Sequence, residues 1–330
     1  MRLTKLTTLS LLVLISTLSC NKDLELNKPP HVDAGDPKSV QLPTSNVSVT
    51  GTASDEDGTV LAYLWSQISG PNVAVIHSPG SLTTNISGLI SGTYVFQLWA
   101  VDNDGGTGVD NVTVTVGASP TITLTLQPDT DGQDALVLYK EGDNRPTPDA
   151  ATNFGSLNNL IYSRWTYSSQ GFGQGSMRSF VKFTGLAAIP ANATILSAKI
   201  SFYGVPSSGF TPEGNSHYPG SPYGTDPNEN KGWIKRVTGT WDESTITWNS
   251  RPPTTDASQV AIPGTTSQWN FNAVDIDVTQ LVKDMRTAGS NEGFCLQLQN
   301  EQIYRNVVFA SSEATDATKR PKIVVDYKLQ

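Results

Sequence analysis

Three short stretches in the second half of the chain, at residues 162–167, 231–236 and 302–306, combine aromatic side chains with Arg or Lys. An aromatic face can stack on the C–H face of a sugar ring, and a guanidinium can bind a carboxylate through two parallel hydrogen bonds. This mixture indicates a binding site for polysaccharide, including acidic polysaccharide. The candidate side chains are Tyr162, Arg164, Trp165, Tyr167, Trp233, Lys235, Arg236, Tyr304 and Arg305.

The 162–167 stretch is the richest of the three. If it is a strand, Tyr162 and Arg164 lie on one face, and Ser163, Trp165 and Tyr167 lie on the other. All three stretches equally fit ordinary strands with one face in the core and one in solvent.

A loop rich in Gly and Pro, residues 207–231, carries two further candidates, Tyr218 and Tyr223. Large aromatic side chains in such a loop have no core of their own to fill. They often mark binding surfaces.

Two acidic loops have the residue types of a calcium site. Asp55 and Asp57 precede Gly58, and Asp102 and Asp104 precede a Gly pair. Carboxylates two residues apart with a Gly turn can surround a hard cation, although neither loop has the twelve-residue EF-hand spacing. Turns that favour Asp, Asn and Gly explain the same pattern without a metal. Calcium is therefore the only cofactor that the sequence suggests, and both explanations stay open.

Catalytic signatures are absent from the sequence. It has no Gly-x-Ser-x-Gly elbow, no His-Glu-x-x-His and no phosphate loop. His31 and His77 are isolated, and His217 beside Tyr218 is the one pair that a polysaccharide lyase could use. Cys295 lies in an alternating strand pattern and is expected to be buried. We therefore expect no enzyme, with a polysaccharide-degrading activity as the least favoured alternative.

The composition favours exported all-β modules. Only 16% of the 330 residues are charged, against a usual ~25%, and Gly and Pro together number 48, from 28 and 20. Such a chain has many turns, and its length suggests two domains. The net charge of −8 and the lack of a long Lys/Arg cluster exclude nucleic acid as a partner.

The first module is predicted to span residues 29–117. Its short alternating segments, bounded by Gly, Pro, Asp or Asn, predict an antiparallel sandwich with Trp65 in the core. The predicted strands are 47–52, 61–67, 73–76, 83–87, 92–101 and 111–116.

Several motifs of this module occur in the order of a PKD-like domain, and the module resembles that family. The resemblance implies an immunoglobulin-like spacer or adhesion module of exported bacterial proteins. The motifs are Ala34-Gly35-Asp36, the segment 53–60, Tyr63-Leu64-Trp65, Gly70-Pro71, the segment 92–96 and the segment 101–106.

The second module is predicted to span residues 118–330, after the boundary at 117–120. One segment, 278–286, has its apolar residues on one helical face, and Gly289 can end that helix. A jelly-roll-type β-sandwich with one short helix fits best. The predicted strands are 121–126, 179–183, 194–203, 233–237, 294–298, 307–310 and 323–327.

This module resembles the DNRLRE domain, which is grouped with carbohydrate-binding module family 96. The resemblance implies non-catalytic binding of polysaccharide, with acidic glycans such as alginate as the ligand type. The insertion at 207–231 departs from the compact family pattern. Trp241 and Trp248, in the most specific motif, are expected to pack in the core, with 245–248 as a strand. The motifs are 153–155, 178–183, 189–195, 240–249, 277–279, 293–294 and 320–323.

The N-terminus resembles a bacterial lipoprotein signal. Arg2 and Lys5 precede an apolar run at 9–15, and small residues lead to Cys20. The resemblance implies cleavage of residues 1–19 and acylation of Cys20, although Thr17 stands where the family usually has Leu. A plain signal peptide with a chance Cys is the alternative. The apolar run is shorter than the ~20 residues that span a bilayer.

Residues 20–28 are predicted to be a lipid-anchored tether. The cluster at 21–25 is similar to the surface-export signal of lipoproteins in Bacteroidetes-like bacteria, although an ordinary solvated tether explains it equally well. The expected protein is a lipid-anchored lipoprotein of the outer membrane or cell surface. It would hold polysaccharide beside glycan-degrading enzymes, and a structural or adhesive surface protein is the alternative from another class.

Overall fold

The computed structural model describes residues 26–128 and 132–330. The chain forms two compact units that divide between Gly117 and Ala118. The predicted signal, Cys20 and residues 20–25 of the predicted tether lie outside the described residues. Among the residues that are described, no helix is long and apolar enough to cross a bilayer.

The described residues of the first unit, 26–117, form nine strands in three sheets. One sheet has the order β2-β9-β8-β5, a second has β3-β7-β6, and β1 pairs with β4. The strands are β1 (His31–Asp33), β2 (Lys38–Gln41), β3 (Asn46–Thr50), β4 (Thr52–Ser54), β5 (Val60–Ser69), β6 (Val75–Ile76), β7 (Thr83–Ser87), β8 (Gly92–Asp102) and β9 (Thr107–Gly117).

The core of this unit follows from strict alternation along its strands. In β8 every second residue from Tyr94 to Asp102 is buried, and in β3 Val47 and Val49 are buried between exposed neighbours. Trp65 on β5 is 2% exposed within the same core, as predicted. The predicted immunoglobulin-like sandwich is confirmed.

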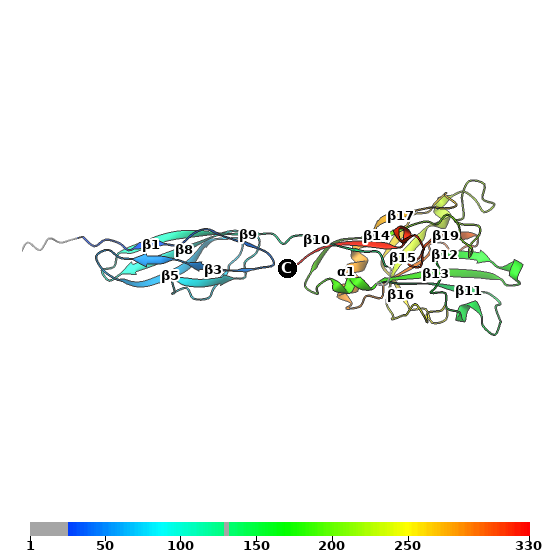
Figure 1. The fold of residues 1–330 in the computed structure, drawn as a ribbon, viewed down its shortest axis with the longest axis horizontal. Helices are drawn as coiled ribbons and strands as arrows, with labels where there is room; N and C mark the ends of the chain where they lie inside the picture. The colour runs from blue at the N-terminus through cyan, green and yellow to red at the C-terminus, as the bar shows by residue number, and fades with distance from the viewer. Residues whose placement is uncertain (1–25, 129–131) are drawn as a thin grey trace, which may run out of the picture. The chain divides into compact units, whose positions relative to one another are not determined.

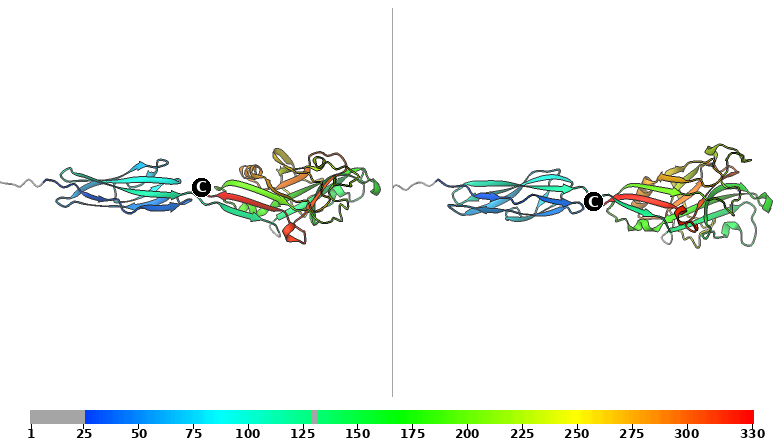
Figure 2. Two further views of the ribbon diagram at one scale, coloured as in Figure 1. Left: turned by 90° about the horizontal axis from the view of Figure 1, so that it is seen from above. Right: turned by 45° about the horizontal axis from the view of Figure 1, so that its top comes forward.

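In the second unit, the residues that the structure describes form eleven strands, one α-helix and five short 3₁₀ helices. Its strands are β10 (Ile122–Leu126), β11 (Gly132–Lys140), β12 (Asn159–Thr166), β13 (Gln174–Phe183), β14 (Thr194–Phe202), β15 (Gly232–Val237), β16 (Thr254–Ile262), β17 (Ala273–Asp277), β18 (Phe294–Leu298), β19 (Arg305–Ala310) and β20 (Lys322–Lys328). The helices are α1 (Thr279–Thr287), η1 (Asp149–Ala151), η2 (Ser168–Gln170), η3 (Thr184–Ala188), η4 (Pro227–Asn230) and η5 (Ala317–Lys319). Figures 1 and 2 show that strands and their connecting loops make up nearly all of this unit.

These strands form two antiparallel sheets. The smaller has the order β10-β20-β14-β17, and the larger has β16-β15-β18-β13-β12-β19, with β11 paired to β13. Strand β13 joins the two halves of the larger sheet, because it pairs with β12 near its start and with β18 further along. Where β12 departs from β13, the Ser179 hydroxyl donates to the Ile161 carbonyl at 2.8 Å and accepts from the Ile161 N–H at 2.7 Å.

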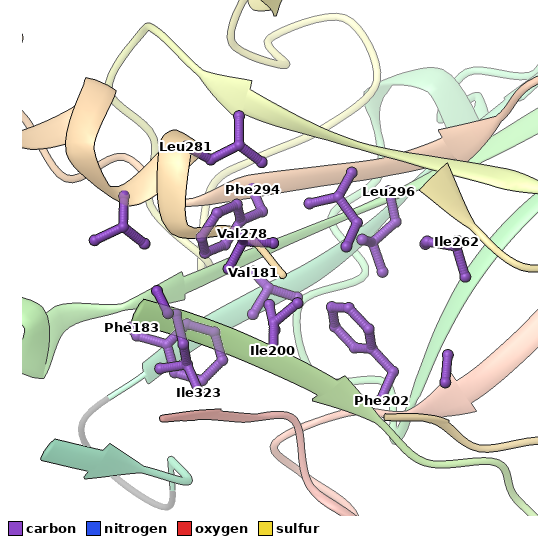
Figure 3. Packing of buried hydrophobic residues seen from close by; sticks show 14 of the residues in the cluster. Val181, Phe183, Ile200, Phe202, Ile262, Val278, Leu281, Phe294, Leu296 and Ile323 are labelled. Carbon is purple, nitrogen blue, oxygen red and sulfur yellow. The ribbon is translucent and has the colours of Figure 1, made fainter. Parts of the chain in front are cut away.

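The main core of the unit lies between the two sheets and beneath α1. Figure 3 shows Val181 and Phe183 of β13 beside Ile200, Phe202 and other apolar side chains from separate strands. The helix contributes Leu281, Val282 and Met285, which are buried on one face as the sequence spacing predicted. The predicted β-sandwich with one short helix is confirmed.

Three local predictions for this unit were tested directly. Trp241 is 9% exposed and packs in an apolar cluster with Phe180, which confirms its structural role. Cys295 is fully buried in the same cluster, as expected. The predicted strand at 245–248 is wrong: turns occur there instead, and the Asp242 carboxylate caps them by accepting from the Ser244 N–H at 2.9 Å.

Candidate functional site

Three of the predicted aromatic side chains meet in the second unit. The Trp165 ring lies 4.8 Å from Tyr223 and 5.5 Å from Tyr304 between ring centroids, edge-on to both. Tyr223 and Tyr304 stack on each other at 4.6 Å. We call these three residues the aromatic cluster. All three are half-buried, so part of each side chain faces solvent.

Strand pairing explains why Trp165 and Tyr304 are neighbours. Strands β12 and β19 are antiparallel with Arg164 opposite Arg305, and the two aromatic residues lie one position beyond that pair. Tyr304 has a φ of 66°. A residue with a Cβ is disfavoured in this left-handed region, and such strain tends to be retained where a side chain must point in a particular direction.

Tyr223 reaches the cluster because the insertion at 207–231 is anchored by buried polar groups. The amide of Asn230, which has no exposed surface, donates to the carbonyls of Ser216 at 2.7 Å and Thr265 at 3.0 Å. Its oxygen accepts from the Thr265 N–H at 2.9 Å. Asn215 likewise accepts from the Val308 N–H on β19 at 2.9 Å. The inserted loop is therefore fixed to the sheet.

A cavity of about 240 Å³ adjoins the cluster. Its walls include Ser163, Trp165, Tyr167, Glu213 and Asn306, which offer hydroxyl, carboxylate and amide groups beside an aromatic face. This is the combination that sugar hydroxyls and C–H faces require. In the described part of the chain, the residues that line this cavity include neither Lys nor Arg.

Tyr162 does not belong to this site, and its assignment as a glycan contact is corrected here. Its side chain is fully buried in the main core, where burial raises the pKa of its hydroxyl. Tyr167 is 9% exposed and packs beneath the Lys140 ammonium, yet it still lines the cavity. Arg305 is 6% exposed and donates to Glu229 and Gln302, so its guanidinium already has anionic and neutral partners.

Three other predicted residues lie apart from the aromatic cluster. Trp233, Lys235 and Arg236 lie on β15, and strands β18 and β13 separate β15 from β12. Lys235 pairs with Asp256 at 2.6 Å.

Tyr218 and Arg164 remain close to the cluster. Burial raises the pKa of Tyr223, and the charge of Glu213 and electrostatic interactions with Tyr304 and Tyr218 raise it further. Arg164 is half-buried and donates to Ser176 at 2.9 Å and to Gln174 at 3.0 Å, both neutral groups.

A second surface of this unit gathers positive charge, and the sequence analysis did not find it. Arg178 and Arg251 line a cavity of about 370 Å³ together with Pro252, Pro253 and Thr254. Trp248 lies beside both guanidiniums, with its ring centroid 4.2 Å from Cζ of Arg251 and 5.5 Å from Cζ of Arg178. We call this surface the arginine pocket.

The two guanidiniums in the arginine pocket are only partly neutralised. Arg178 pairs with Glu301 at 2.8 Å, while its buried Nε has no partner among the described residues. Burial and the charge of Arg178 lower the pKa of Arg251. A carboxylate in the cavity would therefore relieve a repulsion as well as gain hydrogen bonds. The sequence separation of 73 residues between positions 178 and 251 hid this pair, which only the fold brings together.

The two acidic loops of the first unit lie side by side. The Thr59 N–H donates to the Asn103 side-chain oxygen at 2.6 Å, and the Asn103 N–H donates back to the Thr59 carbonyl at 3.0 Å. Asp102 accepts from the N–H groups of Asp104 and Gly106, as an Asx-type turn requires.

Asp55 in these loops keeps both carboxylate oxygens buried without a partner among the described residues. Burial, together with the charges of Asp57 and Asp102, raises the pKa of Asp55. Calcium binding by Asp55, Asp57, Asp102 and Asp104 stays a prediction.

The fold defines a modular all-β protein, in which an immunoglobulin-like sandwich is followed by a larger β-sandwich. Family comparison divides the chain in the same order. Residues 34–116 form a PKD domain and match the family "K319L-like, PKD domain". Residues 222–327 match "Carbohydrate-binding module family 96". Both are families of non-catalytic modules.

Individual relatives share only part of the chain. The mouse Dyslexia-associated protein KIAA0319-like protein is 40% identical over 78 residues, which are 24% of this chain and 7% of that protein. The chain spans between 7% and 20% of the length of the first curated relatives that it matches. The solution structure of the PKD domain from human KIAA0319 is 27% identical, covers 31% of this chain and 93% of that one, and has a TM-score of 0.26. Carbohydrate-binding modules from the β-sandwich superfamily align with 92% of this chain and 98% of theirs, at 12% identity and a TM-score of 0.23.

Proposed function

We propose that this protein is a non-catalytic binder of polysaccharide and that its second unit holds the glycan. The observation that carries the proposal is the aromatic cluster, in which side chains from three separate segments meet beside a polar cavity. Aromatic faces and hydroxyl-binding groups together are what a sugar ring requires. The match of residues 222–327 to a carbohydrate-binding module family supports the same function.

The charges of the two surfaces indicate whether each would bind neutral or acidic sugar units. The cavity beside the aromatic cluster contains Glu213 and neither Lys nor Arg among its described lining residues, so it suits neutral sugar units. The arginine pocket offers two guanidiniums and a Trp face. We therefore infer that a uronic-acid polymer such as alginate, if it is the ligand, places its carboxylates in the arginine pocket.

The test compares glycan affinity of residues 26–330 for neutral and uronic-acid polymers by affinity gel electrophoresis and calorimetry. Trp165→Ala and Tyr223→Ala are expected to weaken binding of any bound glycan. Arg178→Ala and Arg251→Ala are expected to weaken the binding of uronic-acid polymers but not of neutral polymers. The loss of affinity is expected to be larger at low salt, because salt screens exposed charges.

Matched controls keep this test specific. Trp233→Ala removes an aromatic side chain from β15, and Lys328→Ala removes an exposed positive charge from β20; neither is expected to change affinity. A correctly folded protein that binds none of the polymers would contradict the proposal. That result would favour the structural or adhesive alternative.

We also propose that acylated Cys20 anchors the protein in the outer membrane at the cell surface, beside glycan-degrading enzymes. The support is the charged start, apolar run and small residues before Cys20. Incorporation of labelled palmitate into the full chain, lost in Cys20→Ala, tests the anchor. Protease treatment of intact cells tests the surface position, and a protected, unlabelled protein would rule out both.

A further inference from the structure

A group of three carboxylates in the second unit lies outside both surfaces described above. Asp134 comes from β11, Glu243 from the turn after Trp241, and Glu313 from the loop after β19. One oxygen from each can be chosen so that all three lie within 4.8 Å of one another. Three like charges this close repel each other strongly unless a proton or a cation lies between them.

Among the described residues, one buried oxygen of the group has no hydrogen-bond partner. Asp134 is 2% exposed; its Oδ2 accepts from the Ser312 N–H at 2.7 Å, and its Oδ1 has no partner in the described part of the chain. Glu243 accepts from the Asp134 N–H at 3.3 Å. Glu313 accepts from the hydroxyls of Ser311 at 2.8 Å and Ser312 at 2.9 Å. A buried carboxylate oxygen without a donor is costly, and a cation would satisfy it.

No ion pair compensates these charges within the residues described: every donor to the three carboxylates is a backbone N–H or a hydroxyl. Burial, together with the charge of Glu313, raises the pKa of both Asp134 and Glu243, in the latter case to about 7. The same direction at both groups is what unneutralised neighbours of like charge produce.

We propose that Asp134, Glu243 and Glu313 bind one Ca²⁺ ion, which fastens β11 to the turn after Trp241 and the loop after β19. All the ligands are hard oxygens, which suit Ca²⁺ or Mg²⁺. Ca²⁺–O distances of 2.3–2.6 Å allow ligand oxygens up to about 5 Å apart, whereas the shorter Mg²⁺–O distance requires a tighter set. Water completes the coordination.

The experiment adds CaCl₂ or MgCl₂ to residues 26–330 after chelation and follows Tm and calorimetric binding. At calcium about a hundredfold above Kd, a rise in Tm of about 5–10 °C is expected for the second unit. Terbium luminescence excited through Trp is a direct second readout of occupancy. An equal shift with Mg²⁺ would overturn the assignment to calcium.

Substitution locates the ion. Asp134→Asn is expected to raise Tm in chelator, because it removes a buried unpaired charge, and to abolish the rise with calcium. Glu313→Gln is a second variant with the same expected loss of calcium response. Asp242→Asn, next to Glu243 but bound to Ser244, and Asp55→Asn in the first unit serve as controls that keep the response. A calcium response that persists in both Asp134→Asn and Glu313→Gln, or no response in the unaltered protein, would show that the carboxylates share protons instead.

Discussion

At the scale of single residues, Tyr304 connects backbone strain with the proposed function. Its ring completes the aromatic cluster while its backbone stays in the left-handed region at a φ of 66°. An ordinary residue in this region loses roughly 1–2 kcal/mol relative to its relaxed conformation. Tyr at this position is favourable only if its ring makes an interaction that glycine, which has no side chain, cannot make.

A pair of substitutions separates these two effects. Tyr304→Gly is expected to be more stable than Tyr304→Ala by about 1 kcal/mol, and so to unfold at a higher temperature, because Gly alone adopts this φ freely. Both variants lack the ring and are expected to lose glycan affinity equally, by about tenfold or ~1.4 kcal/mol. Thermal unfolding and calorimetric titration on the same samples give both quantities. Equal stability of the two variants would show that the strain is absent.

Burial of Cys295 predicts how the stability of the protein depends on pH. Burial raises the pKa of its thiol to about 12, against ~8.5 in an unfolded chain. The unfolded state therefore releases this proton first, so the stabilisation is complete below pH ~8.5 and is lost as pH rises towards the folded value. When the pH is raised from 8 to 10, the Tm of the unsubstituted protein is expected to fall by more than the Tm of Cys295→Ala. The folded thiol is also expected to resist iodoacetamide, and rapid labelling at neutral pH would contradict its burial.

At the scale of elements, alternation in the sequence predicted most strands because one face is buried and the other is wet. Strand β11 escaped prediction because five consecutive residues, Asp134–Leu138, are buried on both faces and do not alternate. The edge strand β16 escaped for the opposite reason, since most of its residues are at least partly exposed.

The candidate site shows the same limit. Alternation correctly placed Tyr162 and Trp165 on opposite faces of the strand. It does not tell which face packs in the core, and near Tyr162 both faces of β12 are buried. The arginine pocket and the carboxylate group could not be predicted, because their members come from distant segments, and the family motifs that contain Arg178, Glu243 and Trp248 do not say which side chains meet. The insertion supplied Tyr223 as expected from its aromatic content, yet its buried Asn anchors gave no signal in the sequence.

The 3₁₀ helix η4 offers a matched test of how the insertion is held. Asn230 is fully buried and makes three hydrogen bonds, whereas Asn228 in the same turn is exposed. Asn230→Ala leaves three backbone groups without partners and is expected to cost ~2–4 kcal/mol and to weaken glycan binding through Tyr223. Asn228→Ala is expected to change neither by a measurable amount. Differential scanning calorimetry and glycan titration of both variants check this.

At the scale of the whole molecule, the two units have separate cores and separate sheets. Each is expected to fold alone, so the isolated pieces 26–117 and 118–330 should melt at the two transition temperatures of the joined chain. Glycan affinity is expected only in the second piece. Calorimetry of the three proteins tests this, and a shift of more than a few degrees on separation would reveal mutual stabilisation.

The pairing of β10 with β20 has a consequence for how the second unit can be reused. Its first and last strands are neighbours, with Ile122 opposite Tyr327, so the chain enters and leaves the unit at the same place. Such an arrangement tolerates circular permutation and insertion into a host loop. A version with its old ends joined by a short Gly-Ser linker and new ends opened in the exposed segment 144–147 should retain the sandwich. We therefore expect that the unit can be inserted into another protein, with an attachment point chosen independently of the proposed binding surface.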